Sequence, residues 1–355
     1  MASKLRFGVA GTGSFTRRVV VPGLKASGRA EVVALYGRTP LRVEELAVEA
    51  GIPERHASFE SMLASDSIDA VAVCSPNFLH APMAKAALEA GKLVLSEKPL
   101  GIDASETLEL VKAARRTGLG TAVNFTYRSM PAFALAKEMI DAGEMGTIVS
   151  GWFDYSQANW ANPEMPLDWH MQDRESGGGA LADLGSHAID LMRWLVGEVT
   201  AVCGATAIVH HARPIAGGGR GAPTASETAT FICDSGEGRL FAFHLSKLAW
   251  GHANQLAAML SGTRGSLRLF HERGREITLE VASSGEQEFK KVEIPEERRV
   301  AFADFPGHHM RNAIRGMLGE SEFATFEDGH AAQRVIDAVR RSQAERAWGP
   351  VETDL

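Results

Sequence analysis

Short apolar runs alternate with amphipathic patterns over the first 125 residues of the chain. Short apolar runs indicate buried strands, and apolar residues every three or four positions indicate helices. Strands separated by helices of this length predict βαβ units and a parallel sheet. The expected strands are Leu5–Ala10, Glu31–Tyr36, Ala70–Cys74, Leu93–Leu95 and Thr121–Asn124, and the expected helices are Arg17–Ala26, Pro40–Ala50, Ala81–Ala90 and Ala104–Thr117.

The pattern changes after Tyr127 and becomes rich in strands. The short turn Ser235–Gly238 predicts antiparallel pairing of the runs that flank it. The segment Ala212–Pro223 is rich in Gly and Pro, and we expect a mobile loop there. Helices are expected over Pro131–Ala142, Ala180–Val196, Asp304–Leu318 and Asp328–Arg346, and strands over Thr147–Tyr155, Ala201–Val209, Glu227–Cys233, Arg239–Leu245, Leu256–Ser261 and Ser266–Phe270.

Together these patterns predict an α/β protein with two domains and a terminal helix. The first, over residues 1–125, is a doubly wound parallel sheet of the Rossmann type. The second, over residues 126–327, is an α+β domain with a large, open, mainly antiparallel sheet. Residues 328–355 are expected to form a helix that packs back on the first domain.

Composition and charge exclude several classes of protein. The 355 residues include 37 Lys and Arg against 44 Asp and Glu, which gives a formal net charge of −7. This balance argues against a nucleic-acid or anionic-membrane binder. Cys74, Cys203 and Cys233 are widely spaced and indicate neither a disulfide framework nor a zinc site. We find neither a signal peptide nor a long apolar stretch, so we expect a cytoplasmic protein.

The first expected strand runs directly into a glycine-containing turn, Gly11-Thr12-Gly13-Ser14-Phe15-Thr16. Two glycines at this spacing allow a tight turn and let the backbone approach a pyrophosphate at a helix N-terminus. Thr16 stands where the pattern has its third glycine, and a plain strand–helix turn is the alternative. The position after the first strand of a βαβ unit favours dinucleotide binding.

The end of the second expected strand bears on the choice of coenzyme. A carboxylate at this point would bond the ribose hydroxyls of NAD. The sequence has Gly37 and Arg38 instead. A small residue followed by Arg leaves room for a 2′-phosphate and neutralises it, so NADP(H) is favoured over NAD(H). In the alternative, Arg38 stacks on the adenine or faces solvent and either coenzyme is accepted.

Two further strand ends carry polar segments, where a doubly wound sheet binds its ligand. These are Ser75-Pro76-Asn77 with His80, and Ser96-Glu97-Lys98-Pro99. With the glycine turn, they make the chain resemble the Gfo/Idh/MocA family of NAD(P)-dependent oxidoreductases, named for glucose–fructose oxidoreductase and inositol dehydrogenase. The resemblance implies that Lys98 lies near the reacting carbon and the nicotinamide. It also implies cofactor contacts by Ser75, Pro76, Asn77, His80 and Glu97; for His80, a helix cap is the alternative.

The segment Gly177–Asp190 supplies a second pair of candidate catalytic residues. Asp183 and His187 are four positions apart, so on a helix they share one face and can hydrogen-bond. A carboxylate that orients an imidazole is typical of a general base. Gly185 between them predicts a close approach by the cofactor domain or the substrate. The family's catalytic Asp and His correspond to these two residues; the alternatives are an inert ion pair or a metal site, and because no third ligand is evident we expect no metal.

The resemblance implies oxidation of a sugar or polyol alcohol, or the reverse reaction, with the domain over residues 126–327 binding the substrate. His187 would remove the hydroxyl proton and Lys98 would act at the same oxygen. Asn124 is expected beside the nicotinamide, and the loop Asn162–Trp169 resembles that of dehydrogenases of glycosides or anhydrosugars. Ordinary packing is the alternative for each Trp. The candidate substrate contacts are Tyr127, Arg128, Trp160, Asp168 and Trp169, beside Lys98, Asp183 and His187.

Two other functions are compatible with the same residues. One is a glycosidase that uses tightly bound NAD(H) transiently, and the other is a non-catalytic dinucleotide sensor. A sensor needs no proton relay, so Lys98, Asp183 and His187 together argue against it. The strands Ala201–Val209 and Arg239–Leu245 carry more apolar residues than one layer of helices buries. We therefore expect a homodimer or homotetramer formed through the second sheet.

Overall fold

The computed structural model describes residues 4–353, which form two compact units. Unit 1 contains the chain up to Ser129 and the segment Val300–His330, and unit 2 contains the rest. The contacts therefore divide the chain differently from the expected boundaries at residues 125 and 327. The reason is that α10 (Phe305–Met317) packs closely on α1 (Val21–Ala26): a Cβ on Gly23 would come within 2.8 Å of the Pro306 carbonyl oxygen.

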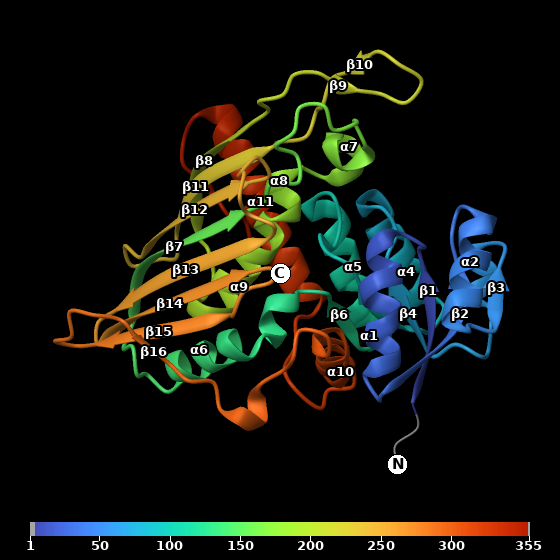
Figure 1. The fold of residues 1–355 in the computed structure, drawn as a ribbon, viewed down its shortest axis with the longest axis horizontal. Helices are drawn as coiled ribbons and strands as arrows, with labels where there is room; N and C mark the ends of the chain where they lie inside the picture. Colours follow the sequence, from blue (N-terminus) through green and yellow to red (C-terminus); the bar gives the residue numbers. More distant parts are fainter. Residues whose placement is uncertain (1–3, 354–355) are drawn as a thin grey trace. The chain divides into compact units, whose positions relative to one another are not determined.

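Unit 1 is built on a six-stranded parallel sheet with the strand order β3-β2-β1-β4-β5-β6 (Figure 1). All five expected strands are present, and the doubly wound fold is confirmed. The strands are β1 (Leu5–Ala10), β2 (Ala30–Tyr36), β3 (Glu54–His56), β4 (Ala70–Val73), β5 (Leu93–Ser96) and β6 (Thr121–Val123). The other helical segments are η1 (Thr16–Val20), α2 (Pro40–Ala50), α3 (Phe59–Leu63), η2 (Asn77–Leu79), α4 (His80–Glu89), α5 (Ala104–Thr117) and η3 (Thr126–Ser129).

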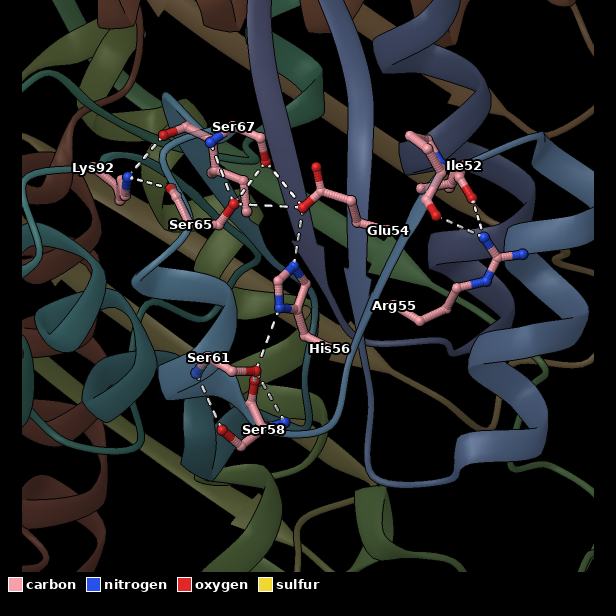
Figure 2. Close-up of polar contacts among 11 residues, drawn as sticks. Ile52, Glu54, Arg55, His56, Ser58, Ser61, Ser65, Ser67 and Lys92 are labelled. Carbon is pink, nitrogen blue, oxygen red and sulfur yellow. Dashed lines mark hydrogen bonds and ion pairs between the residues drawn. The ribbon is translucent and has the colours of Figure 1, made fainter.

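The edge strand β3 is polar and was not expected from the hydrophobic pattern. Its Glu54 carboxylate accepts a hydrogen bond from the Ser67 hydroxyl at 3.0 Å and lies 3.3 Å from Nε2 of His56 (Figure 2). Beside them, the Lys92 ammonium donates to the main-chain carbonyls of Ser65 and Ile68 at 3.0 and 2.8 Å. Polar contacts thus fix a strand that buries little apolar surface.

Unit 2 is built on a nine-stranded sheet with the order β16-β15-β14-β13-β7-β12-β11-β8-β17. Only β7 and β12 run parallel, so the expected mainly antiparallel sheet is confirmed. The strands are β7 (Ile148–Ser156), β8 (Ala201–Ala207), β11 (Thr228–Asp234), β12 (Leu240–Ser246), β13 (Gln255–Gly262), β14 (Gly265–Glu272), β15 (Thr278–Ser283), β16 (Lys290–Lys291) and β17 (Gly349–Pro350). The helical segments are α6 (Pro131–Asp141), η4 (Trp169–Met171), α7 (Asp173–Ser176), α8 (Ala180–Asp183), α9 (Gly185–Val196) and η5 (Glu296–Arg298).

The two faces of this large sheet differ in what covers them. Helices α6, α8 and α9 pack on one face, which carries buried residues such as Phe153 and Phe243 (Figure 1). Side chains alternate between the faces of a strand. The opposite face exposes Trp152 and Ile232, in a row with Ala242 and Met259 across four adjacent strands. That face therefore carries an exposed apolar row among polar side chains.

The segment expected to be a mobile loop forms a small hairpin of β9 (Arg213–Pro214) and β10 (Arg220–Gly221). Its first residue, Arg213, is fully buried and hydrogen-bonds the main chain of the loop after β7. The expectation of a mobile loop was wrong for the β9–β10 hairpin. The many Gly and Pro residues indicated a loop, and the sequence did not show that Arg213 is buried and holds the hairpin in place.

The last helix, α11 (Phe326–Glu345), belongs to both units. Near its start, Nδ1 of His330 lies 2.8 Å from the Thr107 hydroxyl of unit 1. Near its end, the Ser342 hydroxyl accepts a hydrogen bond from the Gly204 amide of β8 at 3.1 Å. Its start thus contacts α5 of unit 1 and its end contacts β8 of unit 2. Neither this helix nor any other within residues 4–353 is long and apolar enough to cross a membrane.

Candidate active site

The glycine turn after β1 has the shape that a dinucleotide requires. Gly11 has a φ of +130°, and a Cβ there would lie 2.2 Å from the Cys74 carbonyl oxygen. Gly13, in contrast, faces open space. Only a glycine at position 11 can combine this positive φ with so close an approach to the Cys74 carbonyl oxygen. Thr16, at the position of the third glycine of the pattern, is buried at the start of η1.

A hollow of about 510 Å³ opens at this turn, lined by Thr12, Gly13, Ser14, Arg17, Arg18, Arg42 and Glu45. Three arginines around a helix start suit an anionic phosphate group. Arg18 is held by the Ser14 hydroxyl, and Arg17 by Glu49 at 2.9 Å. Phe15, which belongs to the same turn and was also expected at the cofactor, has an exposed side chain. The residues present therefore fit a pyrophosphate.

At the end of β2, Gly37 packs on Thr12 and Arg38 is exposed. Arg42 was not singled out from the sequence, but it lies one helical turn further on in α2 and lines the hollow. The spacing of four residues on a helix that begins at Pro40 was the signal that could have found it. Arg38 and Arg42 are thus both exposed, one after the end of β2 and the other in the first turn of α2.

The end of β4 presents a buried hydroxyl without a hydrogen-bond partner among the described residues, that of Ser75. Such a group needs a partner, which a bound ligand can supply. Pro76 and the buried Asn77 follow it. The orphaned hydroxyl beside the glycine turn is a second feature that fits a dinucleotide.

His80 ties two strand ends together. It is 1 % exposed, and its Nδ1 and Nε2 lie 2.7 and 2.8 Å from the carbonyl oxygens of Pro99 and Ser75. Burial lowers the pKa of the ring below its ordinary value. Both ring nitrogens thus face main-chain carbonyls, and the His80 side chain connects the segments that follow β4 and β5.

A buried chain of hydrogen bonds leads from α10 to Glu97. The Asn124 amide donates to the Glu97 carboxylate, and Nε2 of His309 donates to the Asn124 carbonyl oxygen. On the other side of the ring, Nδ1 of His309 lies 2.8 Å from the Ser129 hydroxyl. Burial, with the neighbouring His308, lowers the pKa of His309 to about 3, so the ring is neutral. His309 was missed because nothing in its helix marks it.

Lys98 follows Glu97 at the end of β5 and is half-buried. Tyr127 and Arg128, expected at the substrate, are both buried. The Arg128 guanidinium pairs with the Asp328 carboxylate at 2.9 Å. Arg128 thus has a partner within unit 1 that anchors the start of α11.

In unit 2, Asp183 ends α8 and His187 lies in the first turn of α9. Leu184 between the helices keeps helical angles, so the two residues stay on the same face. A Cβ on Gly185 would lie 3.1 Å from Cδ1 of Leu245 in β12. The close approach that this glycine permits is made by a strand of the same unit, so the expectation of a cofactor domain or substrate there was wrong.

His187 is buried, and its ring centre lies 6.2 Å from that of Tyr155. The Tyr155 hydroxyl donates to the Asn254 side chain at 3.0 Å. Asp183 forms an ion pair with Lys247, a residue just after β12 that the sequence analysis missed. The available signal was the position of this lysine directly after an apolar strand. Lysine is almost never buried without a partner, so a lysine there indicates a nearby acidic group.

The loop between β7 and α7 carries the aromatic candidates. Trp160 is 3 % exposed and packs under Lys247, whose ammonium lies 4.3 Å from the indole centre. Trp169 is half-buried and stacks on the exposed His170 with ring centres 3.6 Å apart. Burial would raise the pKa of Asp168, but the hydrogen bond from His170 lowers it below its usual range. Only Trp169 of the two therefore presents indole surface.

Within residues 4–353 we find no group of three His, Cys, Asp or Glu side chains placed to hold a metal ion.

Comparison with known proteins identifies relatives over the whole chain. Residues 5–125 match the family model of the Gfo/Idh/MocA oxidoreductase family, NAD-binding Rossmann fold, and residues 133–268 match the Gfo/Idh/MocA C-terminal domain. Levoglucosan dehydrogenase of Pseudarthrobacter phenanthrenivorans is 29 % identical over 338 residues, 86 % of each chain. D-xylose 1-dehydrogenase (NADP(+)) 2 of Haloferax volcanii is 34 % identical over 57 % of this chain and 60 % of that protein.

The solved structure of levoglucosan dehydrogenase in complex with NADH and levoglucosan is similar over 99 % of this chain and 100 % of that one. Its TM-score is 0.90 and its sequence identity 26 %. Fold and sequence thus agree on the same group of relatives.

Proposed function

Because this chain belongs to the Gfo/Idh/MocA family of NAD-binding oxidoreductases, we propose that it transfers hydride between a nicotinamide coenzyme and the hydroxyl or carbonyl carbon of a sugar, glycoside or polyol. The observation that carries the proposal is the group formed by the buried His187 and Lys247 with the partly exposed Asp183. A carboxylate next to an imidazole equips that imidazole to accept a hydroxyl proton near neutral pH. The similarity to enzymes named for levoglucosan and D-xylose supports a carbohydrate substrate.

The proposed reaction assigns one task to each catalytic residue. His187 accepts the proton of the substrate hydroxyl, and Asp183 orients the imidazole. Lys98 is assigned to the same oxygen, where an ammonium stabilises the negative charge that develops as the O–H bond breaks. When bound, the nicotinamide ring supplies the acceptor for the hydrogen and electron pair that leave the carbon. The alcohol carbon becomes a carbonyl carbon, and the reverse sequence reduces it.

For the coenzyme, the proposal favours NADP(H) over NAD(H). Arg38 and Arg42 would pair with the 2′-phosphate, and no carboxylate stands at the end of β2 to bond free ribose hydroxyls. Thr12, Gly13 and Ser14 would hold the pyrophosphate through main-chain amides, and Ser75 would find its missing partner. Asn124 and Glu97 would contact the nicotinamide riboside.

For the substrate, the proposal places Trp169 and Asp168 beside the sugar. An indole face covers the apolar C–H patch of a sugar ring, and a carboxylate accepts hydrogen bonds from its hydroxyls. The loop that carries them is fixed by hydrogen bonds from Arg213 to the carbonyls of Trp160 and Asn162, at 2.6 and 2.9 Å. A fixed loop favours a cyclic substrate of defined shape, such as an anhydrosugar or glycoside.

We also propose that two copies associate through the open face of the large sheet. The apolar row of Trp152, Ile232, Ala242 and Met259 is flanked by Asp154 and His244, whose side chains pair at 2.6 Å. A row of this kind is self-complementary, so a copy related by a two-fold axis can pack its own row against it. The occupant of the face is thus a second copy of this chain.

The test is an assay of the purified protein with NAD⁺ and NADP⁺ against levoglucosan, D-xylose, methyl glycosides and inositols, following reduced nicotinamide by absorbance. We expect reduction with at least one cyclic carbohydrate. The variant H187N should lose about 10²- to 10⁴-fold in kcat, the range for a general base. The control H56N alters a histidine of the β3 cluster and should keep wild-type activity (Figure 2). Products formed without net reduction would indicate a glycosidase, and the proposal would fail.

A further inference from the structure

Lys247 is an unusual lysine because its charged end is buried. The residue is 4 % exposed, and its main chain is held on both sides. Its amide donates to the Glu227 carbonyl at 3.0 Å, and its carbonyl accepts from the Trp160 amide at 2.9 Å. The backbone at this position is therefore fixed, and the side chain points away from solvent.

The ammonium group has two partners that both favour its charged form. One is the Asp183 carboxylate, whose Oδ2 accepts its hydrogen bond, and the other is the face of Trp160. An indole face attracts a cation, more strongly where water is excluded. A buried ammonium needs such partners, because its desolvation is otherwise too costly.

Asp183 is one helical turn from His187, so a charge fixed on the carboxylate also acts on the imidazole. A lone carboxylate would favour the protonated ring, whereas an added ammonium opposes it. Other titratable groups beside these residues include Asp168, which interacts with Lys247, Tyr155, which packs on His187, and Asp190 on the next turn of α9.

We propose that Lys247 is a positioning residue for the general base: its ammonium fixes the Asp183 carboxylate and balances its charge, which keeps His187 unprotonated and ready to accept a proton. The catalytic meaning of this inference rests on the proposed function. The electrostatic coupling among Lys247, Asp183 and His187 does not depend on that function. Trp160 then packs against the Lys247 ammonium and does not stack on the sugar.

The first test measures His187 itself, in the protein without coenzyme or substrate. The ring is followed by NMR as pH is varied, and its signal is identified by its loss in H187N. In K247M the pKa of His187 should rise by about one unit, because a nearby cation has been removed. K247R keeps the charge and should leave the pKa near the wild-type value. The matched control is K92M, which alters another partly buried lysine, one that hydrogen-bonds only main-chain carbonyls of unit 1 (Figure 2).

The second test measures kcat/KM against pH with the best carbohydrate. In K247M the acid limb of the profile should move up by about one pH unit, so the loss at pH 6 should exceed the loss at pH 9 about tenfold. Should K247M fail to fold, K247Q is the replacement, because its amide still donates to Asp183 without carrying a charge.

The outcomes separate the two proposals. An unchanged His187 pKa in folded K247M or K247Q overturns the role of Lys247, whatever the enzyme's substrate. A shifted pKa in a protein that oxidises no carbohydrate supports the coupling and overturns the proposed function instead. A uniform loss of activity at every pH, with no shift, would reduce Lys247 to a residue that only stabilises the fold.

Discussion

Arg213 and Glu227 form an ion pair that is removed from solvent, with 2.7 Å between the guanidinium and the carboxylate and side-chain exposures of 0 % and 1 %. The same guanidinium donates to the carbonyls of Trp160 and Asn162. The second carboxylate oxygen accepts from the amides of Val209 and His210, each at 2.7 Å. One buried pair therefore joins the loop after β7, the β9–β10 hairpin and the start of β11.

Removing one partner of this pair should be costly, because the other charge is left buried alone. For R213M we expect a loss of about 3–5 kcal/mol in the free energy of unfolding, measured by urea denaturation. The control R220M alters an exposed arginine of the same hairpin, paired with Glu164 at 3.1 Å, and should cost about 1 kcal/mol or less. Equal small losses in both variants would contradict the anchoring role of Arg213.

His309 should make the protein less stable in acid. Its pKa is about 3 in the folded protein against an ordinary value of 6.5, so the unfolded chain binds the proton more tightly. Stability is therefore full above about pH 6.5 and falls toward pH 3, by up to about 1.4 kcal/mol per pH unit. In H309L the loss between pH 6.5 and 5 should shrink by about 2 kcal/mol.

The matched control for this prediction is S129A, which removes the hydrogen-bond partner of His309 but no titratable group. Its unfolding free energy should keep the wild-type dependence on pH. If H309L also kept that dependence, the ring would not be held neutral by burial.

The coenzyme preference should depend on two arginines. We expect R38A and R42A each to weaken NADPH binding about 10- to 100-fold, the loss of a charge-assisted hydrogen bond, and to leave NADH binding unchanged. Titration calorimetry measures both affinities. R55A is the control, because Arg55 is another arginine that contacts α2, through Glu44, but lies on β3. Equal losses for both coenzymes would indicate adenine stacking rather than phosphate binding.

The open sheet face should hold two copies together. Light scattering at micromolar concentration should give at least the mass of a dimer for the wild type. A carboxylate in the apolar row, W152E, should shift the protein toward a monomer, because a charge would be desolvated at the interface. F302E changes a side chain that is 76 % exposed outside this sheet and should keep the wild-type mass. A monomeric wild type would end this part of the proposal.

The parallel sheet could be predicted closely because its strands are continuous apolar runs. β1 was expected over the residues where it occurs, and β2 differs by one residue. β3 was missed because Glu54 and His56 are held by polar contacts and not by burial, so no hydrophobic pattern marks it. β15 was missed next to the short edge strand β16 of the other sheet, where its side chains are mostly only partly buried.

The candidate site could be predicted where a motif sits at a strand end or on one helix face. The glycine turn, Lys98, Asp183 and His187 were proposed in this way. Lys247, His309 and Arg213 were not, because each gains its partners from segments 14 to 185 residues away. A sequence shows the residue type at such a position but not the tertiary contact that gives it a role.

The central claim is tested most directly by the path of the hydrogen. The carbohydrate that is active in the assay is supplied with deuterium at every carbon, and the reduced coenzyme is analysed by mass spectrometry. Direct transfer predicts one deuterium on each nicotinamide formed, slowed turnover, and loss of the signal in H187N. A reduced coenzyme without deuterium, or labelled carbohydrate converted with no reduced coenzyme at all, would contradict an oxidoreductase that passes hydride from sugar carbon to nicotinamide.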